Sequence, residues 1–290
     1  MVRSSKTGVS GSKTAISGPA EAAAFFFDFN AAFPSVSHDW LFDALQASKL
    51  HPKIIGAIKK LYHNNFHYLK LHGETFPSVL IQSGVKQGCP LSPTLFAIAI
   101  DVLIRELVDI IGDKGTTKAF ADDIAVVSGT RRLHIPKFEK IFSCFGAATA
   151  LSINVKKSFA VPLGDLRMKE LQDMLRTLTQ QWGDFSCALK AKYLGFWVGP
   201  GASINDCLHS ALEKTEKRAA HWKNSKLGLF WSVLILNSLV LSPLWFCLQL
   251  YHPPKNINRH VLNICFRVLG GPWNWASLRD LCNLDRWGLP

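Results

Sequence analysis

Two short apolar runs that contain acidic residues constrain the fold of this chain more than any other feature. Residues 24–29 read Ala-Phe-Phe-Phe-Asp-Phe, which places Asp28 directly after four apolar residues. Residues 119–127 read Ala-Phe-Ala-Asp-Asp-Ile-Ala-Val-Val, which places Asp122 and Asp123 between apolar flanks. Runs of this kind predict buried strands, and a buried carboxylate is costly without a partner or a cation. The sequence therefore predicts a sheet whose strands end at carboxylates.

Each acidic position has two interpretations from the residues alone. Asp28 either caps the turn after its strand or binds a cation, and the Asp122-Asp123 pair is either ordinary turn chemistry or a cation site. Two adjacent carboxylates repel each other, and apolar flanks hydrate them poorly, so a divalent cation would make the arrangement favourable. A strand-end Asp and a hairpin Asp pair are the minimum for two Mg²⁺ ions. Such ions would activate a 3′-hydroxyl and stabilise a leaving pyrophosphate.

Alternating helical and extended patterns surround these runs. Pro52 stands in the favoured first turn of one predicted helix, and Pro136 is expected to open another. The predicted helices span 37–50, 52–64, 91–112 and 136–150, and the predicted extended segments span 67–71, 77–82, 117–121, 124–128, 153–161 and 193–198. From Asn205 onward the sequence is mostly helical. This order predicts an α+β fold with an appended α-helical module.

The chain is strongly basic, which restricts the class of its partners. Its 33 Lys and Arg residues against 21 Asp and Glu residues give a formal net charge of +12. This balance points to a polyanionic partner, either a nucleic acid or an anionic membrane surface. The seven cysteines include no Cys-x-x-Cys pair, which argues against a zinc ribbon and against a secreted disulfide framework. We therefore expect an intracellular protein, in the nucleus or the cytoplasm.

The uncharged stretch over residues 227–251 is long enough to span a bilayer. Polar residues and a proline interrupt it, among them Asn237, Ser242 and Pro243. A fully buried helical region of a large soluble protein has the same composition. We therefore expect this stretch to form a helical core and expect no stable association with a membrane.

Five blocks in order between residues 25 and 198 resemble the palm motifs of reverse transcriptases of LINE-type, non-LTR retrotransposons. Residues 27–38 read Phe-Asp-Phe-Asn-Ala-Ala-Phe-Pro-Ser-Val-Ser-His. Residues 83–96 read Ser-Gly-Val-Lys-Gln-Gly-Cys-Pro-Leu-Ser-Pro-Thr-Leu-Phe and form the most specific block. The other three blocks are Phe120-Ala121-Asp122-Asp123, residues 151–158 with their Asn-x-x-Lys-Ser core, and Tyr193-Leu194-Gly195.

The resemblance implies a right-hand polymerase palm, with an antiparallel sheet packed on helices and partial fingers, over residues 25–198. We expect a flexible tail over 1–24, and the resemblance implies an α-helical, thumb-like module over 199–290. The implied activity is that of an RNA-directed DNA polymerase, which adds dNTPs to a primer 3′-hydroxyl. The implied partners are an RNA template, a DNA primer and dNTPs, with two Mg²⁺ ions as cofactors.

The resemblance also assigns roles to single residues. It implies that Asp28 and Asp122 bind the two Mg²⁺ ions and that Asp123 is the third acid. It implies that Phe33 is an aromatic gate that clashes with a ribonucleotide 2′-hydroxyl. The other implied roles are nucleotide and template contacts by Gln87 and Gly88, neutralisation or protonation of the departing pyrophosphate by Lys157, and a primer grip formed by Tyr193, Leu194 and Gly195. An ordinary solvated lysine is the other interpretation of Lys157.

The helical region has an amphipathic pattern. One stripe of a predicted helix carries Leu208, Leu212, Thr215, Ala219 and Trp222, whereas the basic residues lie mainly elsewhere: Lys214, Lys217, Arg218, Lys223 and Lys226. This pattern resembles a thumb helix that lies along the template–primer duplex through phosphate contacts. A solvated basic face is the alternative interpretation.

The chain departs from the family pattern at two positions and upstream of Phe25. Ala31 stands where Lys is frequent and Pro34 where Asp is frequent, and neither is an implied metal ligand. Residues 1–24 resemble neither fingers nor an endonuclease, so we expect a piece of a larger polyprotein or of an eroded element. The alternative function is therefore a catalytically silent remnant that binds nucleic acid in a salt-dependent way.

Overall fold

The computed structural model of the chain describes residues 22–164, 167–223, 225, 227–254 and 256–269. The chain divides into two compact units, one ending at Leu194 and the other beginning at Gly195. This division falls in the turn between strand β8 (Ala191–Tyr193) and strand β9 (Phe196–Val198). Most of the predicted flexible tail, residues 1–21, lies outside the described residues.

A five-stranded sheet forms the centre of the first unit, in the order β4-β5-β1-β6-β7. Its strands are β1 (Ala23–Phe27), β4 (Gly115–Phe120), β5 (Asp123–Ser128), β6 (Phe159–Pro162) and β7 (Ser186–Cys187). β1 pairs antiparallel with β5 and β6, and β4 pairs antiparallel with β5, whereas β7 pairs in parallel with β6. The predicted antiparallel palm sheet is therefore confirmed, with a parallel edge strand that the sequence does not predict.

Apolar side chains on both faces explain the central place of β1. Phe25 and Phe27 are buried in the main core of the first unit. Ala24 and Phe26, which alternate with them, pack on the other face against Val161 of β6. Alternate residues of a strand point to opposite faces, so a strand that is apolar throughout is stable only in the interior of a sheet.

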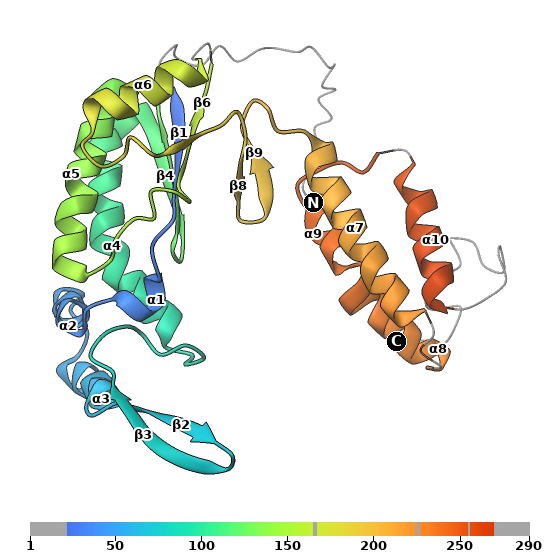
Figure 1. Cartoon of the computed structure of the whole chain (residues 1–290), viewed down its shortest axis with the longest axis horizontal. Helices are drawn as coiled ribbons and strands as arrows, with labels where there is room; N and C mark the ends of the chain where they lie inside the picture. The colour runs from blue at the N-terminus through green and yellow to red at the C-terminus, as the bar shows by residue number, and fades with distance from the viewer. Residues whose placement is uncertain (1–21, 165–166, 224, 226, 255, 270–290) are drawn as a thin grey trace, which may run out of the picture. The chain divides into compact units, whose positions relative to one another are not determined.

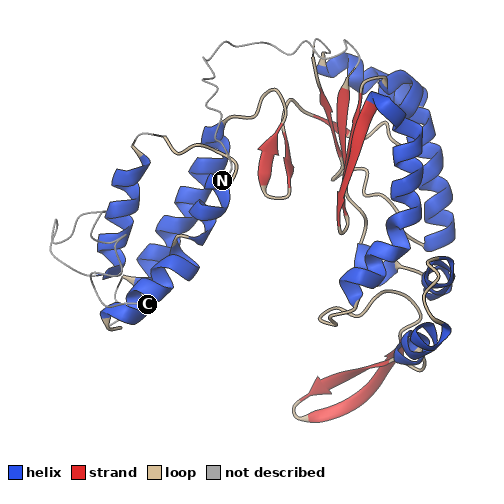
Figure 2. Ribbon diagram, turned by 180° about the vertical axis from the view of Figure 1, so that it is seen from behind, coloured by secondary structure: helices blue, strands red, loops and turns tan. Residues whose placement is uncertain are grey.

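Helices α4 and α5 cover one face of the sheet, as Figures 1 and 2 show. The described helices of this unit are α1 (Ala32–Ser35), α2 (His38–Ala47), α3 (Pro52–Tyr62), α4 (Ser92–Ile111), α5 (Arg131–Thr149) and α6 (Met168–Leu178), together with the 3₁₀ turn η1 (Gly112–Lys114). The spacing of Phe96, Ile100, Leu103 and Leu107, four and three residues apart, predicts one apolar face on α4, and all four side chains are buried. Helices α1 and α6 are not among the helices predicted from the sequence.

Helix α5 begins at Arg131, so the prediction that Pro136 opens this helix is wrong. The buried His134 lies in the first turns, where Ser128 Oγ is 2.7 Å from its Nδ1 and Thr130 Oγ1 is 3.3 Å from its Nε2. An internal proline removes one helical hydrogen bond. Contacts between the start of α5 and the end of β5 offset that loss.

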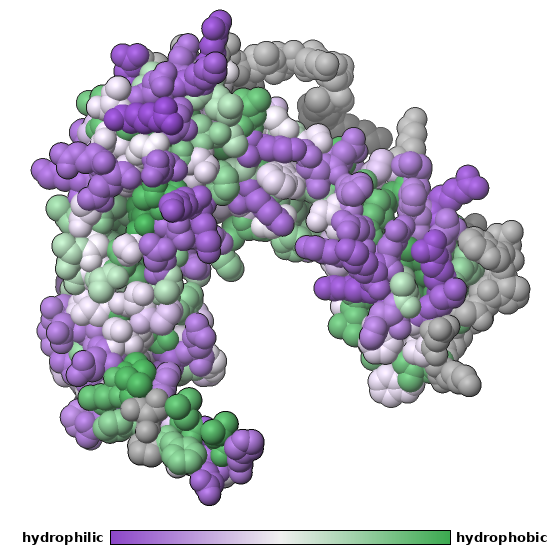
Figure 3. Space-filling view, viewed as in Figure 1, coloured by the Kyte–Doolittle hydropathy of each residue, from purple (hydrophilic) through white to green (hydrophobic). Residues whose placement is uncertain are grey.

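Strands β2 (Phe66–Leu71) and β3 (Glu74–Leu80) form a separate two-stranded hairpin. Several large apolar side chains of this hairpin are exposed, including Tyr68 at 62% and Leu69 at 64%. Figure 3 shows the corresponding hydrophobic surface over the hairpin. An isolated hairpin of two strands is marginally stable in water, so this is the least supported element of the first unit.

The second unit is helical, as predicted. It contains α7 (Ile204–Trp222), α8 (Leu229–Ile235), the π-helical turn η2 (Leu236–Val240), α9 (Ser242–Leu248) and α10 (Ile257–Leu269). α7 buries Leu208, Thr215 and Ala219 of the predicted stripe. Ser203 and Asp206 form a capping box at its start, which provides hydrogen-bond acceptors for backbone N–H groups that have none within the helix.

The basic face of α7 is partly used within the protein. Arg218 Nη1 donates hydrogen bonds to the Leu239 carbonyl at 2.6 Å and to Ser242 Oγ at 2.9 Å, and Lys217 pairs with Glu213 at 2.7 Å. Lys226 lies outside the described residues. Arg218 therefore stabilises the end of η2, which a sequence pattern of basic residues does not reveal.

Within the described residues, no single helix combines the length and the apolar character needed to cross a bilayer. The pair Phe230–Val240 and Ser242–Leu248, bent by 49°, passes the same test together on length and composition alone. Part of this stretch forms the core of the second unit, where Leu236, Val240 and Leu244 are buried.

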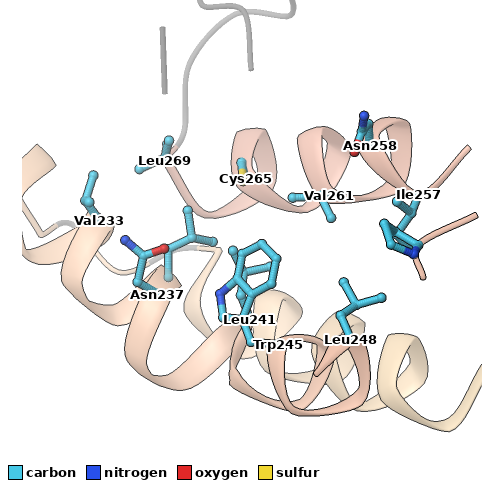
Figure 4. Close-up of a pocket in the computed structure, with 12 residues that line it drawn as sticks. Val233, Asn237, Leu241, Trp245, Leu248, Ile257, Asn258, Val261, Cys265 and Leu269 are labelled. Carbon is cyan, nitrogen blue, oxygen red and sulfur yellow. The ribbon is translucent and has the colours of Figure 1, made fainter. Parts of the chain in front are cut away.

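The second unit also contains an apolar pocket of about 210 Å³. Figure 4 shows Leu241 and Trp245 on one side and Val261 and Cys265 of α10 on the other. The residues that line it carry no ionisable acid or base apart from the Cys265 thiol. This pocket is therefore unsuited to acid–base or cation chemistry.

Candidate active site

The strand register brings Asp28 to the same end of the sheet as Asp122 and Asp123. Phe27, the last residue of β1, pairs with Ile124, so the next residue, Asp28, reaches the start of β5. All three acids are half-buried. The prediction that strands end at carboxylates is therefore confirmed, and two distant segments supply them.

The hairpin turn beside Asp28 has an uncommon backbone. Phe120 pairs with Asp123, which leaves Ala121 and Asp122 as the two turn residues between β4 and β5. Ala121 adopts a φ of 51°. A positive φ at a residue with a Cβ costs energy, and such residues cluster at functional sites. The turn therefore fixes the backbone at Asp122, which directly follows Ala121.

The main chain of Asp28 is held on its other side by residues 154–158. Its N–H donates to Ser158 Oγ at 3.1 Å, and its carbonyl accepts from the Asn154 N–H at 2.7 Å. Ser158 is fully buried, and its hydroxyl donates to the Asn154 carbonyl at 2.9 Å. Asp28 is therefore fixed by its backbone, which leaves its carboxylate available.

Ser158 orients the main chain of Asp28, a role that the sequence motifs do not predict. The available signal is its spacing from Asn154, because a Ser four residues after an Asn can close a tight turn through hydrogen bonds. The long-range bond to Asp28 itself has no local sequence signal, because the two residues are far apart in the chain.

The acids interact through their charges. Burial raises the pKa of Asp28, the nearby Lys157 ammonium lowers it, and the Asp122 carboxylate raises it. Burial also raises the pKa of Asp123, and the carboxylates of Asp122 and Asp28 raise it further. The three acids are thus within electrostatic reach of one another, and a bound cation would relieve their repulsion.

These donors suit a magnesium ion. Among the described residues, no group of three or more His, Cys, Asp and Glu side chains converges to form a complete metal site. Mg²⁺ needs fewer protein ligands, because it commonly binds one or two carboxylates and completes its shell with water and phosphate oxygens. Asp28 and Asp122 supply oxygen donors of this class. The residues present therefore fit Mg²⁺ held jointly with a phosphate-bearing ligand.

A pocket of about 400 Å³ is lined by the three residues predicted to contact the nucleotide and the template. Phe33, Gln87 and Gly88 all line it, together with Cys89, Pro90, Ser92 and Pro93. Gly88 has a φ of +83°, and a Cβ added there would have no atom of the described chain within 4 Å. The structure thus brings together an aromatic ring from α1 and a glycine-containing loop from the start of α4.

The loop that carries Gln87 is bonded to the segment that carries Phe33. The Val85 N–H donates to the Phe33 carbonyl at 2.8 Å, and the Gly84 N–H donates to the Val36 carbonyl at 2.7 Å. Gly84 packs so closely on Pro34 that an added Cβ would lie 2.5 Å from the Pro34 carbonyl oxygen. Pro34, one of the departures from the family pattern, is therefore part of the contact that builds the pocket.

Lys157 is exposed and lies in the turn that follows Asn154. Its ammonium lowers the pKa of Asp28, which places its charge near that carboxylate. The structure therefore brings Lys157 to the acids. Its role in neutralising or protonating pyrophosphate stays a prediction.

The predicted primer-grip residues form a turn, so the prediction of one extended segment over 193–198 is wrong. Leu194 and Gly195 adopt φ values of 48° and 87°, as a two-residue hairpin turn requires. The Tyr193 hydroxyl donates to the Asp123 carbonyl at 3.4 Å, and its ring lies 5.4 Å from that of Phe26. Tyr193 is thus next to the acids, and the contact with a primer stays a prediction.

Comparisons with known proteins agree with the motifs. The family model described as reverse transcriptase (RNA-dependent DNA polymerase) matches residues 6–198. An uncharacterized 149 kDa protein of transposon TX1 from Xenopus laevis is 26% identical over 271 residues, which are 88% of this chain and 20% of that protein. A Pol polyprotein from the type-2 retrotransposable element R2DM of Drosophila melanogaster is 32% identical over 139 residues, which are 46% of this chain and 13% of that protein.

The chain spans about a fifth or less of the length of these two relatives. Among solved structures, telomerase from Candida tropicalis in complex with a fragment of telomeric RNA has a TM-score of 0.48 and 10% identity. That similarity covers 89% of this chain and 45% of the telomerase chain.

Proposed function

This chain belongs to the reverse transcriptase (RNA-dependent DNA polymerase) family, and from that premise we propose that it carries out RNA-templated addition of dNTPs to a primer 3′-hydroxyl. It would act as the palm and thumb-like portion of a non-LTR retrotransposon enzyme. One observation carries this proposal: the register of β1 and β5 gathers Asp28, Asp122 and Asp123 at one end of the sheet. Their mutual repulsion supports a role in binding cations.

The pocket of Phe33, Gln87 and Gly88 is proposed to receive the incoming nucleotide. A flat ring at Phe33 suits a deoxyribose and leaves no room for a 2′-hydroxyl. Gly88 presents open main chain to the pocket, because it lacks a Cβ at a positive φ. Gln87 is exposed at the same rim and can donate and accept hydrogen bonds.

The proposed ligands of two Mg²⁺ ions are Asp28 and Asp122, with Asp123 as the third acid. When bound, the ions would lower the pKa of the primer hydroxyl and neutralise phosphate charge. The protein orients the ligands: Ser158 and Asn154 fix the backbone of Asp28, and the strained turn at Ala121 fixes Asp122. The Lys157 ammonium would balance the charge of the departing pyrophosphate.

The test is incorporation of labelled dTTP on a poly(rA)·oligo(dT) substrate by the full 290-residue chain with Mg²⁺. Asp122→Asn should reduce incorporation by about 100-fold or more, because the loss of one group that stabilises transition-state charge commonly lowers the rate by that factor. Asp101→Asn is the matched control, because Asp101 is an exposed residue of α4 that pairs with Arg105. Equal incorporation by wild type and Asp122→Asn would overturn the proposed site.

An RNA template and a DNA primer are the proposed macromolecular partners, supported by the net charge of +12 and by the family. Binding without incorporation, with affinity falling steeply as salt rises, would favour the silent remnant instead. A location inside the cell, in the nucleus or the cytoplasm, is proposed on the scattered sequence positions of the cysteines, which include no Cys-x-x-Cys pair. Imaging of the tagged full chain tests that location.

A further inference from the structure

The ring of Phe33 is stacked on a second aromatic ring that is buried beneath it. The ring centroids of Phe33 and Phe96 are 4.6 Å apart, and the ring planes are inclined by 16°. Phe96 lies on α4 and is fully buried in the core, whereas Phe33 is half-buried and lines the pocket. One ring therefore faces the pocket, and the other supports it from the core.

The backbone of Phe33 has its own support. Its carbonyl accepts the Val85 N–H at 2.8 Å, and the next hydrogen bond joins Gly84 to Val36 at 2.7 Å. With the main chain held in this way, the freedom that Phe33 retains is rotation of its side chain. Phe96 limits that rotation, because a nearly parallel ring fills the space into which Phe33 would otherwise turn.

We propose that Phe96 is a positioning residue for sugar selectivity: its ring holds Phe33 where it excludes a ribonucleotide 2′-hydroxyl. This inference rests on the proposed function, because Phe33 can select a sugar only if the pocket receives a nucleotide. Phe96 is not among the residues that line the described pocket, so it acts through Phe33 and not by touching the nucleotide.

Removal of the Phe96 ring should leave the pocket in place and give the Phe33 side chain more rotational freedom. Leucine at position 96 keeps an apolar side chain in the core but offers no flat surface to Phe33. Phe33 then gains orientations in which a 2′-hydroxyl fits. We expect the preference for dATP over ATP to fall by about threefold to tenfold in Phe96→Leu, as an aromatic pair of this geometry is worth a factor of that order.

The experiment compares equilibrium binding of dATP and ATP to the full chain with an RNA template and a DNA primer, in Ca²⁺ to prevent turnover. The ratio of the two dissociation constants is the readout, and the ratio of kcat/KM values in Mg²⁺ is the second. Phe145→Leu is the matched control, because Phe145 is a core phenylalanine whose ring contacts Trp40. It should lower stability and leave the ratio unchanged.

Phe96→Tyr separates positioning from stability. It buries a hydroxyl and should lower the melting temperature, but it retains a flat ring and should keep the wild-type ratio. Phe96→Met replaces Phe96→Leu if the leucine variant does not fold. An unchanged ratio in the variant that lacks the ring overturns the inference and leaves the proposed function intact. Wild-type protein that binds neither nucleotide overturns the proposed function, and the inference with it.

Discussion

Replacing Gly84 by alanine tests how closely the loop over residues 83–88 packs on helix α1. The new Cβ would lie 2.5 Å from the Pro34 carbonyl oxygen and 2.6 Å from the Pro34 Cα. These are backbone atoms, so the loop itself must move. The φ of +83° adds about 1–2 kcal/mol for a residue with a Cβ. Overpacking of this kind costs about 1–3 kcal/mol, so we expect Gly84→Ala to lower the free energy of unfolding by about 2–5 kcal/mol.

Gly88→Ala is the matched comparison. Gly88 has the same φ of +83°, but a Cβ added there would have no atom of the described chain within 4 Å. It should therefore cost only the backbone strain, about 1–2 kcal/mol. Urea denaturation of wild type and both variants gives the three free energies of unfolding. If the two variants lose the same free energy, the close packing of Gly84 on Pro34 is refuted.

Three further substitutions test individual contacts. Asp123→Asn should raise the free energy of unfolding at pH 7, because burial and two neighbouring carboxylates raise the pKa of Asp123. This stabilisation should vanish as the pH falls through the raised pKa to below 3.8, because the Asp123 carboxyl of the wild type is then neutral, as the asparagine of the variant always is. Urea denaturation at pH 3.5 and pH 7 measures the difference in free energy of unfolding between variant and wild type. An equal difference at both pH values would contradict the raised pKa of Asp123 as its cause. Arg218→Met should cost about 0.5–1.5 kcal/mol, because the hydrogen bond from its exposed guanidinium to the Leu239 carbonyl is lost. An unchanged melting temperature would show that the bond contributes nothing. Tyr251→Phe should lower the free energy of unfolding by about 1 kcal/mol, because the hydrogen bond from the Tyr251 hydroxyl to the Trp197 carbonyl is lost. Urea denaturation measures this change, and a stabilised variant would exclude a favourable contribution from the bond.

Local patterns in the sequence predict the elements whose own apolar residues determine which of their faces are buried. The apolar run that ends at Asp28 becomes β1, and the spacing of Phe96 and Leu103 correctly predicts the buried face of α4. The motifs place Phe33 and Gln87 in one site, and the pocket contains both. These features follow from side-chain periodicity or from residues that recur at fixed spacing.

The remaining features depend on contacts between different elements of the fold. Pro136 lies inside α5 because His134 bonds to Ser128 in the preceding strand. The bond from the Asp28 main chain to Ser158 spans 130 residues. Arg218 stands in a basic pattern typical of phosphate binding, but its guanidinium bonds within the protein. The periodicity of a single helix or strand does not predict these contacts, because each of them joins two different elements.

The central claim is that Asp28 and Asp122, from two separate strand ends, bind the same metal centre. A titration of Mn²⁺, followed by electron paramagnetic resonance, tests it on the full chain with an RNA template, a dideoxy-terminated primer and dNTP. We expect Asp28→Asn and Asp122→Asn each to weaken Mn²⁺ binding by about 10-fold or more, with Asp101→Asn unchanged. Wild-type affinity in either of the first two variants would contradict the claim.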